Sequence, residues 1–202
     1  MALADDDWLE PNYVAECLRT LLSQPDLAAV CGKPRMFRGQ DYLHEGRKTS
    51  LLQDSAGWRV LQYLGRVEEN VPFHALMRRE VVTAVPPMSH TLAADWIYIA
   101  SIVFSGKVRT LDSTAVNKGW AGTSHSWESQ VRAGGLPSYQ ARIPYLAIIA
   151  ATFKNIAWTS PVYESCGRMG RFVLACKASV VLAMKLGEWG AGVLKQRWKG
   201  TM

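Results

Sequence analysis

The chain has 202 residues, of which 49% are hydrophobic and 20% are charged, and its formal net charge is +6. This length suits one domain, or one domain with an appendage, and the composition excludes an intrinsically disordered chain. The charge is unevenly placed, because residues 151–202 hold 8 basic and 2 acidic side chains. A basic C-terminal tail predicts an anionic partner, and a membrane surface is one candidate.

The start of the chain is acidic and lacks the basic segment of a secretory signal. No uninterrupted apolar stretch reaches the roughly 18–20 residues that a membrane-spanning helix needs. The sequence holds four cysteines, Cys17, Cys31, Cys166 and Cys176. Their spacing matches no metal site, which favours a reduced setting. We therefore expect a cytoplasmic protein, with the inner face of the plasma membrane as a candidate peripheral location.

Three adjacent carboxylates, Asp5, Asp6 and Asp7, stand close to the start of the sequence. Like charges this close repel one another, and a hard divalent cation such as Mg²⁺ or Mn²⁺ removes that cost. The alternative is a solvated acidic helix start, where Asp interacts favourably with the helix dipole. If Ala2 to Ala4 ends a strand, the triplet lies where open α/β sheets bind ligands.

The first predicted helix follows Pro11 and ends near Ser23, with apolar residues at helical spacing. These residues are Val14, Cys17, Leu18, Leu21 and Leu22. The apolar run from Leu27 to Cys31 predicts a buried strand, which residues 33–37 continue after a bend. Residues 38–70 are polar and mixed, and they predict a lid or connector that contains one helix.

Further elements follow along the chain. Residues 72–77 predict a strand, and residues 78–82 a short helix. Residues 91–105 are apolar nearly all round, which indicates a buried helix closed by a C-terminal cap at Gly106. Residues 107–111 predict another strand. The last predicted elements are two basic helices, over residues 137–154 and 168–185.

Two further candidate site residues, Asp95 and His125, lie in residues 91–125. Asp95 falls in the first turn of the predicted helix 91–105, where a lone Asp is typical of a dipole or cap residue. The functional alternative is a general base at a pocket wall. Residues 117–125 are rich in glycine and polar residues, which is typical of a site loop. His125 is there a candidate metal or phosphate ligand, against the alternative of a solvated side chain.

Three of these stretches, in this order, resemble the inverting GT-A glycosyltransferases of the large family two. Residues 5–11 resemble the DxD region, residues 73–80 the strand that leads to an Arg-Arg-Glu helix start, and residues 94–96 the acidic catalytic motif. The resemblance covers about residues 4–130. It implies an α/β fold: a truncated GT-A-like mixed sheet with flanking helices in residues 1–130, and a basic helical extension in residues 131–202.

The resemblance also implies roles for the acidic residues. Asp5 and Asp7, with His125 as a further ligand, would hold a divalent metal, Mg²⁺ or Mn²⁺. Asp5 and Asp6 would contact the nucleotide-sugar donor. Asp95 would take the proton of an acceptor hydroxyl. The implied activity is hexosyl transfer with inversion to a glycan or a lipid-linked acceptor, in the synthesis of a bacterial polysaccharide or surface glycan.

The sequence departs from the family pattern at two points. The family motif at the base is usually Glu-Asp, whereas Ala94 precedes Asp95 here. The family's N-terminal nucleotide-binding half is missing, so we expect weak donor binding by this chain alone. We also expect exposed apolar faces that favour homo-oligomerisation.

Two alternatives stay open beside an active transferase. One is an inactive truncated remnant. The other is a non-catalytic module whose basic tail binds a membrane or an acidic partner. Binding of nucleic acid by the tail, through Trp189 and Trp198, is not expected because no recognised nucleic-acid motif accompanies these residues.

Overall fold

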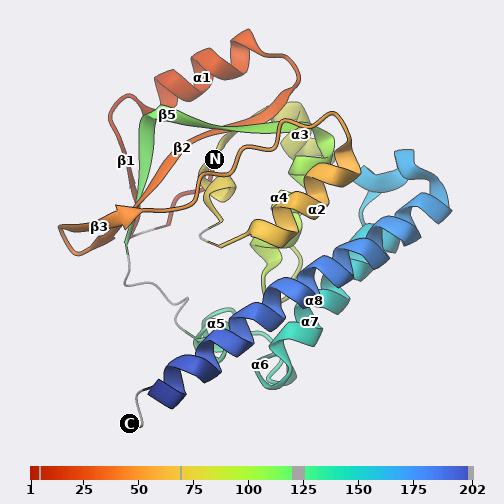
Figure 1. Cartoon of the computed structure of the whole chain (residues 1–202). Helices are drawn as coiled ribbons and strands as arrows, with labels where there is room; N and C mark the ends of the chain where they lie inside the picture. Colours follow the sequence, from red (N-terminus) through yellow and green to blue (C-terminus); the bar gives the residue numbers. More distant parts are fainter. Residues whose placement is uncertain (5, 69, 120–125, 200–202) are drawn as a thin grey trace.

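The chain folds into an α/β structure with a mixed β-sheet and flanking helices, as the sequence predicted (Figure 1). The computed structural model describes residues 1–4, 6–68, 70–119 and 126–199, with side chains as far as residue 188. The strands of the sheet are β1 (Trp8–Leu9), β2 (Leu27–Arg38), β3 (Asp41–Glu45), β4 (Leu76–Met77) and β5 (Lys107–Gly119).

The two long strands, β2 and β5, are parallel and lie at the centre of the sheet, whose order is β1-β5-β2-β3. β1 pairs with β5 in antiparallel orientation, and β3 and β4 both pair antiparallel with β2. Because β2 and β5 run in the same direction, their carboxyl ends meet at one edge of the sheet. β1 lies beside the carboxyl end of β5.

The helices form layers around this sheet. They are α1 (Tyr13–Ser23), α2 (Ala56–Arg66), α3 (Arg79–Ala84), α4 (Ala94–Ser105), α5 (Trp127–Ala133), α6 (Tyr139–Arg142), α7 (Pro144–Lys154) and α8 (Gly167–Lys199), with the short helices η1 (Val71–His74), η3 (Asn155–Thr159) and η4 (Pro161–Cys166). α1 covers one face of the sheet, and α4 packs on the other with α2 (Figure 1). α8 packs against α2 and α7 and forms the outermost layer.

Helix α4 confirms the predicted buried helix, but its end differs from the prediction. Gly106 has a φ of −174°, which is extended backbone rather than the left-handed conformation of a glycine cap. Gly106 therefore closes α4 as predicted, with its N–H donating to the carbonyl of Ile102, but without the left-handed conformation of a glycine cap. The reason for glycine here is space, since a Cβ on Gly106 would lie 2.8 Å from the Cβ of Ala28 in β2.

Helix α1 also confirms its prediction, with a narrower buried face than expected. Tyr13, Cys17 and Leu21 are buried against the sheet. Val14 and Leu18 are 47% and 44% exposed, because each follows a buried residue and so lies about 100° further round the helix. A row of apolar side chains, which includes Val14 and Leu18, therefore stays exposed along α1.

Several boundaries predicted from the sequence are wrong. Residues 1–4 form no strand, and a short strand, β1, follows the Asp triplet instead. β5 continues past its predicted end to Gly119, so part of the predicted site loop is strand. The predicted helix 137–154 is two helices, since Pro144 begins α7 and holds Ile143 outside helical conformation.

The core is one continuous set of buried apolar side chains. Val30 in β2, Val103 in α4 and Leu182 in α8 all belong to it. Residues on both sides of position 130 thus share a core, and the division into a domain and an extension stays a prediction. Among the helices that the structure describes, none combines the length and the apolar character needed to cross a membrane.

Candidate functional site

Asp7 lies at the carboxyl end of β5. Trp8 pairs with Asn117 across β1 and β5, which brings the preceding Asp7 beside Lys118 and Gly119. The backbone N–H of Gly119 donates a hydrogen bond of 3.0 Å to Asp7 Oδ1, and the Asp7 side chain is 4% exposed. Asp7 is therefore not at a helix start, since α1 begins only at Tyr13.

The neighbouring acidic residue, Asp6, lies with its backbone carbonyl close to Gly119, the last residue of β5. A Cβ placed on Gly119 would lie 2.7 Å from the carbonyl oxygen of Asp6, so glycine permits this close approach. Asp5 and His125 lie outside the residues that the structure describes, and their predicted roles stay predictions.

A histidine and a lysine complete the surroundings of Asp7. Lys118 Nζ lies 3.8 Å from Asp7 Oδ2 and 3.0 Å from His74 Nε2. His74 Nδ1 lies 3.2 Å from the carbonyl oxygen of Ala2. His74 Nε2 also lies 3.3 Å from Asp7 Oδ2. In the tautomer that carries its hydrogen on Nδ1, neutral His74 donates from Nδ1 to Ala2, and its Nε2 accepts from the Lys118 ammonium rather than donating to Asp7.

Burial, and after it the positive charge of Lys118, lower the pKa of His74 from 6.5 to about 4. The nearby Asp7 carboxylate opposes the shift without cancelling it. His74 is therefore neutral at pH 7. It holds the ammonium of Lys118 in place beside the Asp7 carboxylate without adding a charge of its own.

We predict that the free energy of unfolding decreases as the pH falls from about 6.5 to about 4, by at most about 3 kcal/mol from His74. In this window the unfolded chain binds a proton at His74 and the folded chain does not. Urea denaturation at a series of pH values measures the effect. His74→Gln should flatten the pH dependence, whereas His44→Gln, at an exposed position of β3, should retain it. Equal slopes in both variants would contradict the prediction.

Asp95 lies in the first turn of α4 and is held from outside that helix. Asn70 Nδ2 donates a hydrogen bond of 2.7 Å to Asp95 Oδ2, and Tyr63 donates one of 2.6 Å to Asn70 Oδ1. Burial raises the pKa of Asp95, while the hydrogen bond from Asn70 and the charge of Lys118 act in the opposite direction. The carboxylate is therefore a stronger base than an exposed Asp, in an orientation that Asn70 fixes.

The backbone around Asp95 is strained. Asn70 and Ala93 have φ values of 45° and 53°, and they are the non-glycine residues with positive φ in the part of the chain that the structure describes. Asn70 holds the Asp95 carboxylate, and Ala93 is the N-cap of α4. The left-handed conformation costs about 1–2 kcal/mol at Ala93, and less at Asn70 because asparagine adopts it more readily. Both strained residues thus help to place Asp95.

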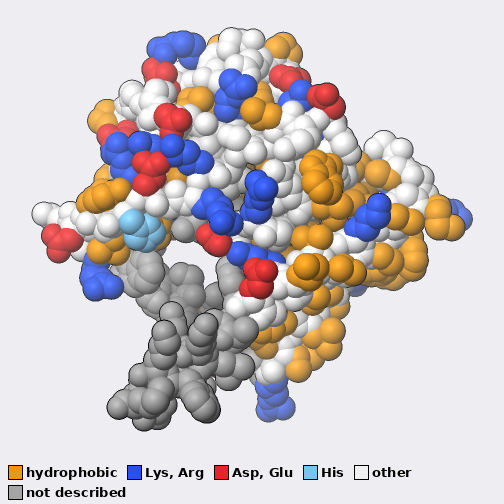
Figure 2. Space-filling view, in the orientation of Figure 1, with side chains coloured by type: hydrophobic (Ala, Val, Ile, Leu, Met, Phe, Trp, Pro, Cys, Tyr) orange, Lys and Arg blue, Asp and Glu red, His pale blue; other side chains and the backbone are white. Residues whose placement is uncertain are grey.

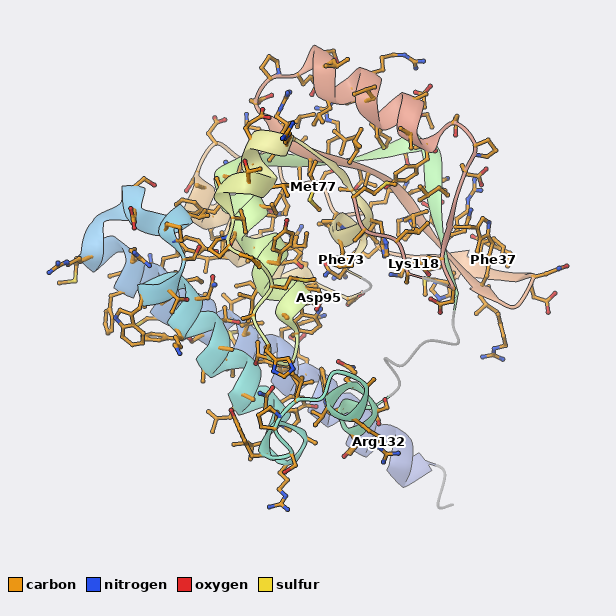
Figure 3. All side chains as sticks on the ribbon, turned by 180° about the vertical axis from the view of Figure 1, so that it is seen from behind. Phe37, Phe73, Met77, Asp95, Lys118 and Arg132 are labelled. Atoms are coloured by element: carbon orange, nitrogen blue, oxygen red, sulfur yellow. The ribbon has the colours of Figure 1, made fainter. Side chains whose placement is uncertain are left out.

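Lys118 links the two acidic residues that the sequence singled out. Its ammonium faces Asp7, and its charge lowers the pKa of Asp95. Figure 3 labels Asp95, Phe73 of η1 and Lys118 in the same central region of the view. We call Asp7, Asn70, His74, Asp95 and Lys118 the polar cluster. Lys118 belongs to the last residues of β5, with Asp7 beside it, and Asp95 is related to them through the charge of Lys118.

Sequence reasoning identified Asp7 and Asp95 but missed the other three members of the polar cluster. His74 lies within the stretch that resembles the family's strand and helix start, and Lys118 lies in the predicted site loop. Neither position has a local pattern that indicates its role. Each acts through a partner that only the folding of the chain brings near.

Within the described ranges, we find no group of three or more His, Cys, Asp or Glu side chains that could hold a metal ion. Two groups face Asp7 Oδ2: His74 Nε2 at 3.3 Å, and the ammonium of Lys118, a cation, at 3.8 Å. The polar cluster therefore does not fit a metal ion on its own. Among known proteins, no family model, no curated protein and no solved structure matches the chain.

Proposed function

We propose that this chain is the acceptor-side part of an inverting glycosyltransferase with a GT-A-like fold. It would transfer a hexose from a nucleotide-sugar donor to a hydroxyl of a glycan or a lipid-linked acceptor, in the synthesis of a bacterial surface glycan. One observation carries the proposal: Asp7 and Asp95, far apart in the sequence, are both related to Lys118, whose ammonium lies 3.8 Å from Asp7 Oδ2 and whose charge lowers the pKa of Asp95. Open α/β sheets bind ligands at this edge, beyond the carboxyl ends of parallel strands.

Asp95 acts as the general base in this proposal. As the acceptor oxygen forms its bond to the anomeric carbon, the hydroxyl proton moves to the Asp95 carboxylate, and the bond from that carbon to the diphosphate oxygen breaks. Burial favours this role because it raises the pKa of Asp95. Asn70 supports the step by holding Asp95 Oδ2.

Lys118 stabilises the leaving group. The nucleoside diphosphate gains negative charge as its bond to the sugar breaks, and a fixed ammonium beside it lowers the energy of that state. Contacts with His74 Nε2 and Asp7 hold the ammonium. Because His74 is neutral at pH 7, it orients Lys118 and leaves the positive charge on the lysine.

A divalent cation, Mg²⁺ or Mn²⁺, remains part of the proposal, with the donor as its second source of ligands. Such ions bind through one or two carboxylates together with substrate phosphates. Asp7 would supply a carboxylate, Asp5 and His125 would add further ligands, and the donor diphosphate would complete the set. When bound, the ion would neutralise charge on the leaving diphosphate.

Titration calorimetry of Mn²⁺ into the protein, with and without UDP, tests the proposed site. We expect UDP to strengthen Mn²⁺ binding at least tenfold, and Asp7→Asn to remove this strengthening, because the diphosphate and the Asp7 carboxylate share the ion. Asp112→Asn is the matched control, since the Asp112 side chain is 73% exposed and pairs with Lys48. A circular dichroism melt of each variant confirms that it is folded.

Two results would contradict the proposal. One is UDP binding that neither Mn²⁺ nor Asp7→Asn changes. The other is the absence of any UDP binding by the folded protein at millimolar concentration, which would favour the non-catalytic module.

A further inference from the structure

An apolar stripe runs along the outer side of α8. Its residues are Met169, Phe172, Val173, Cys176, Val180, Ala183 and Met184, all of them exposed. At 3.6 residues per turn they fall within a sector of about 120°. The opposite side of the same helix carries Leu174, Ala178 and Leu182, which are buried in the core. α8 is thus apolar on two faces, and the core covers only one of them.

Aromatic contacts extend this stripe onto the neighbouring helices. The ring of Phe153, in α7, lies 5.8 Å from the ring of Phe172 and 5.1 Å from that of Trp158. Trp158 is 64% exposed, and Leu146 on α7 is 60% exposed. We call the α8 stripe together with these α7 and η3 side chains the α7–α8 face. Figure 2 shows hydrophobic side chains gathered over this side of the molecule.

Basic side chains border the α7–α8 face. Lys177 lies about 80° round α8 from Met169 on one side of the stripe, and Arg168 lies about 100° from it on the other. Both are exposed, as is Lys154 at the end of α7. An apolar centre with a basic border matches an interfacial helix, which buries its apolar side chains at the level of the lipid headgroups and places its cations among them.

Charge favours an anionic lipid surface as the partner. Arg168, Lys177 and Lys154 border the face, and anionic headgroups would neutralise these cations. A second copy of the chain would carry the same basic border and so would bring no net negative charge to it. We propose that the α7–α8 face docks on the surface of an anionic lipid bilayer, with Met169, Phe172 and Met184 inserted below the headgroups.

Co-sedimentation with lipid vesicles tests this docking. We expect the protein to bind vesicles of phosphatidylcholine with 30 mol% phosphatidylglycerol at least tenfold more tightly than vesicles of phosphatidylcholine alone. The double variant Phe172→Gln/Met184→Gln should lose at least tenfold of the binding to anionic vesicles, because it removes two inserted side chains. Both side chains are exposed, at 48% and 66%, so the fold should tolerate the change.

Leu22→Gln is the matched control. Leu22 is 70% exposed on α1, on the other side of the sheet from α8 (Figure 1), and its substitution should leave vesicle binding unchanged. Arg168→Glu/Lys177→Glu should weaken binding to anionic vesicles and leave the weak binding to neutral ones as it is. Equal vesicle binding by the wild type and by Phe172→Gln/Met184→Gln would overturn the proposal. The proposal would also be overturned if the wild type did not bind vesicles but formed a dimer, and if Phe172→Gln/Met184→Gln were a monomer.

Discussion

Asp95→Asn is expected to lower the turnover of sugar transfer by about 10²–10⁴-fold, the range for loss of a general base. The same change should raise the free energy of unfolding at pH 7, because it replaces a largely desolvated charge by a neutral group of the same shape. Asparagine can still accept the hydrogen bond from Asn70. A variant that is less active and more stable is typical of a residue selected for function.

The stability gain has a defined pH dependence. Burial raises the pKa of Asp95 from its ordinary 3.8, so in the wild type the associated stability is fully present below pH 3.8 and is lost as the pH rises through the folded-state pKa. Asparagine does not titrate. The difference in unfolding free energy between Asp95→Asn and wild type should therefore be present at pH 7 and vanish below about pH 4.

Two measurements check this prediction: release of UDP from a panel of UDP-sugars in the presence of Mn²⁺, and urea denaturation at pH 7 and pH 4. Asp26→Asn is the control, since the Asp26 side chain is 58% exposed and pairs with Lys107. It should change neither turnover nor stability appreciably. Turnover within threefold of wild type in Asp95→Asn would rule out Asp95 as the base. A loss of stability at pH 7 would assign it a structural role instead.

Arg78→Met is expected to lower the free energy of unfolding by about 3 kcal/mol, because it removes a donor from three backbone carbonyls, of which Gln24 keeps the N–H of Leu27. Arg78 Nε donates to the carbonyl of Leu27, at 2.7 Å, and its Nη2 donates to the carbonyls of Leu21 and Gln24. These carbonyls belong to the end of α1 and the start of β2. A single guanidinium thus joins the helix that covers one face of the sheet to the central strand.

The adjacent arginine provides a matched control. Arg79 is exposed, and Arg79→Met removes the same charge and leaves the same apolar stem. Its effect should stay within about 0.5 kcal/mol. Urea denaturation of both variants at one pH measures the difference. Similar losses in the two variants would show that net charge, rather than the carbonyl contacts of Arg78, governs the effect.

The elements that the sequence predicted best have a strong pattern of their own. The i, i+3, i+4 spacing in α1 and the apolar circumference of α4 each indicate a helix without reference to the rest of the chain. The run from Leu27 to Cys31 predicts β2 because a central strand is buried on both faces. In each case the local hydrophobic pattern matches the burial of the element in the folded protein.

Elements that depend on pairing were missed or shortened. β3 (Asp41–Glu45) is exposed along its whole length, so it has no apolar alternation to reveal it. β5 continues through Asp112 and Ser113, both exposed, and reaches Gly119 because β2 pairs with it as far as that residue. A polar strand held by its neighbours has no signal in its own residues.

The same limit explains what the sequence could show of the polar cluster. The acidic residues Asp7 and Asp95 stand out by type and position. His74 and Lys118 gain their roles only from each other and from Asp7, through contacts that join β5 to η1 and to the start of the chain. The predicted family does not reveal these contacts, because its motifs name residues and not their partners.

The strain at Asn70 and Ala93 bears on how this protein would respond to selection for heat resistance. Both residues hold left-handed backbone beside Asp95, and glycine adopts that conformation without a Cβ penalty. At Asn70 glycine would also leave the Tyr63 hydroxyl and the Asp95 carboxylate without their partner, so only Ala93→Gly offers a route to a more heat-resistant chain. Ala93 is the N-cap of the helix that carries Asp95, so at this position heat resistance and the placement of Asp95 compete.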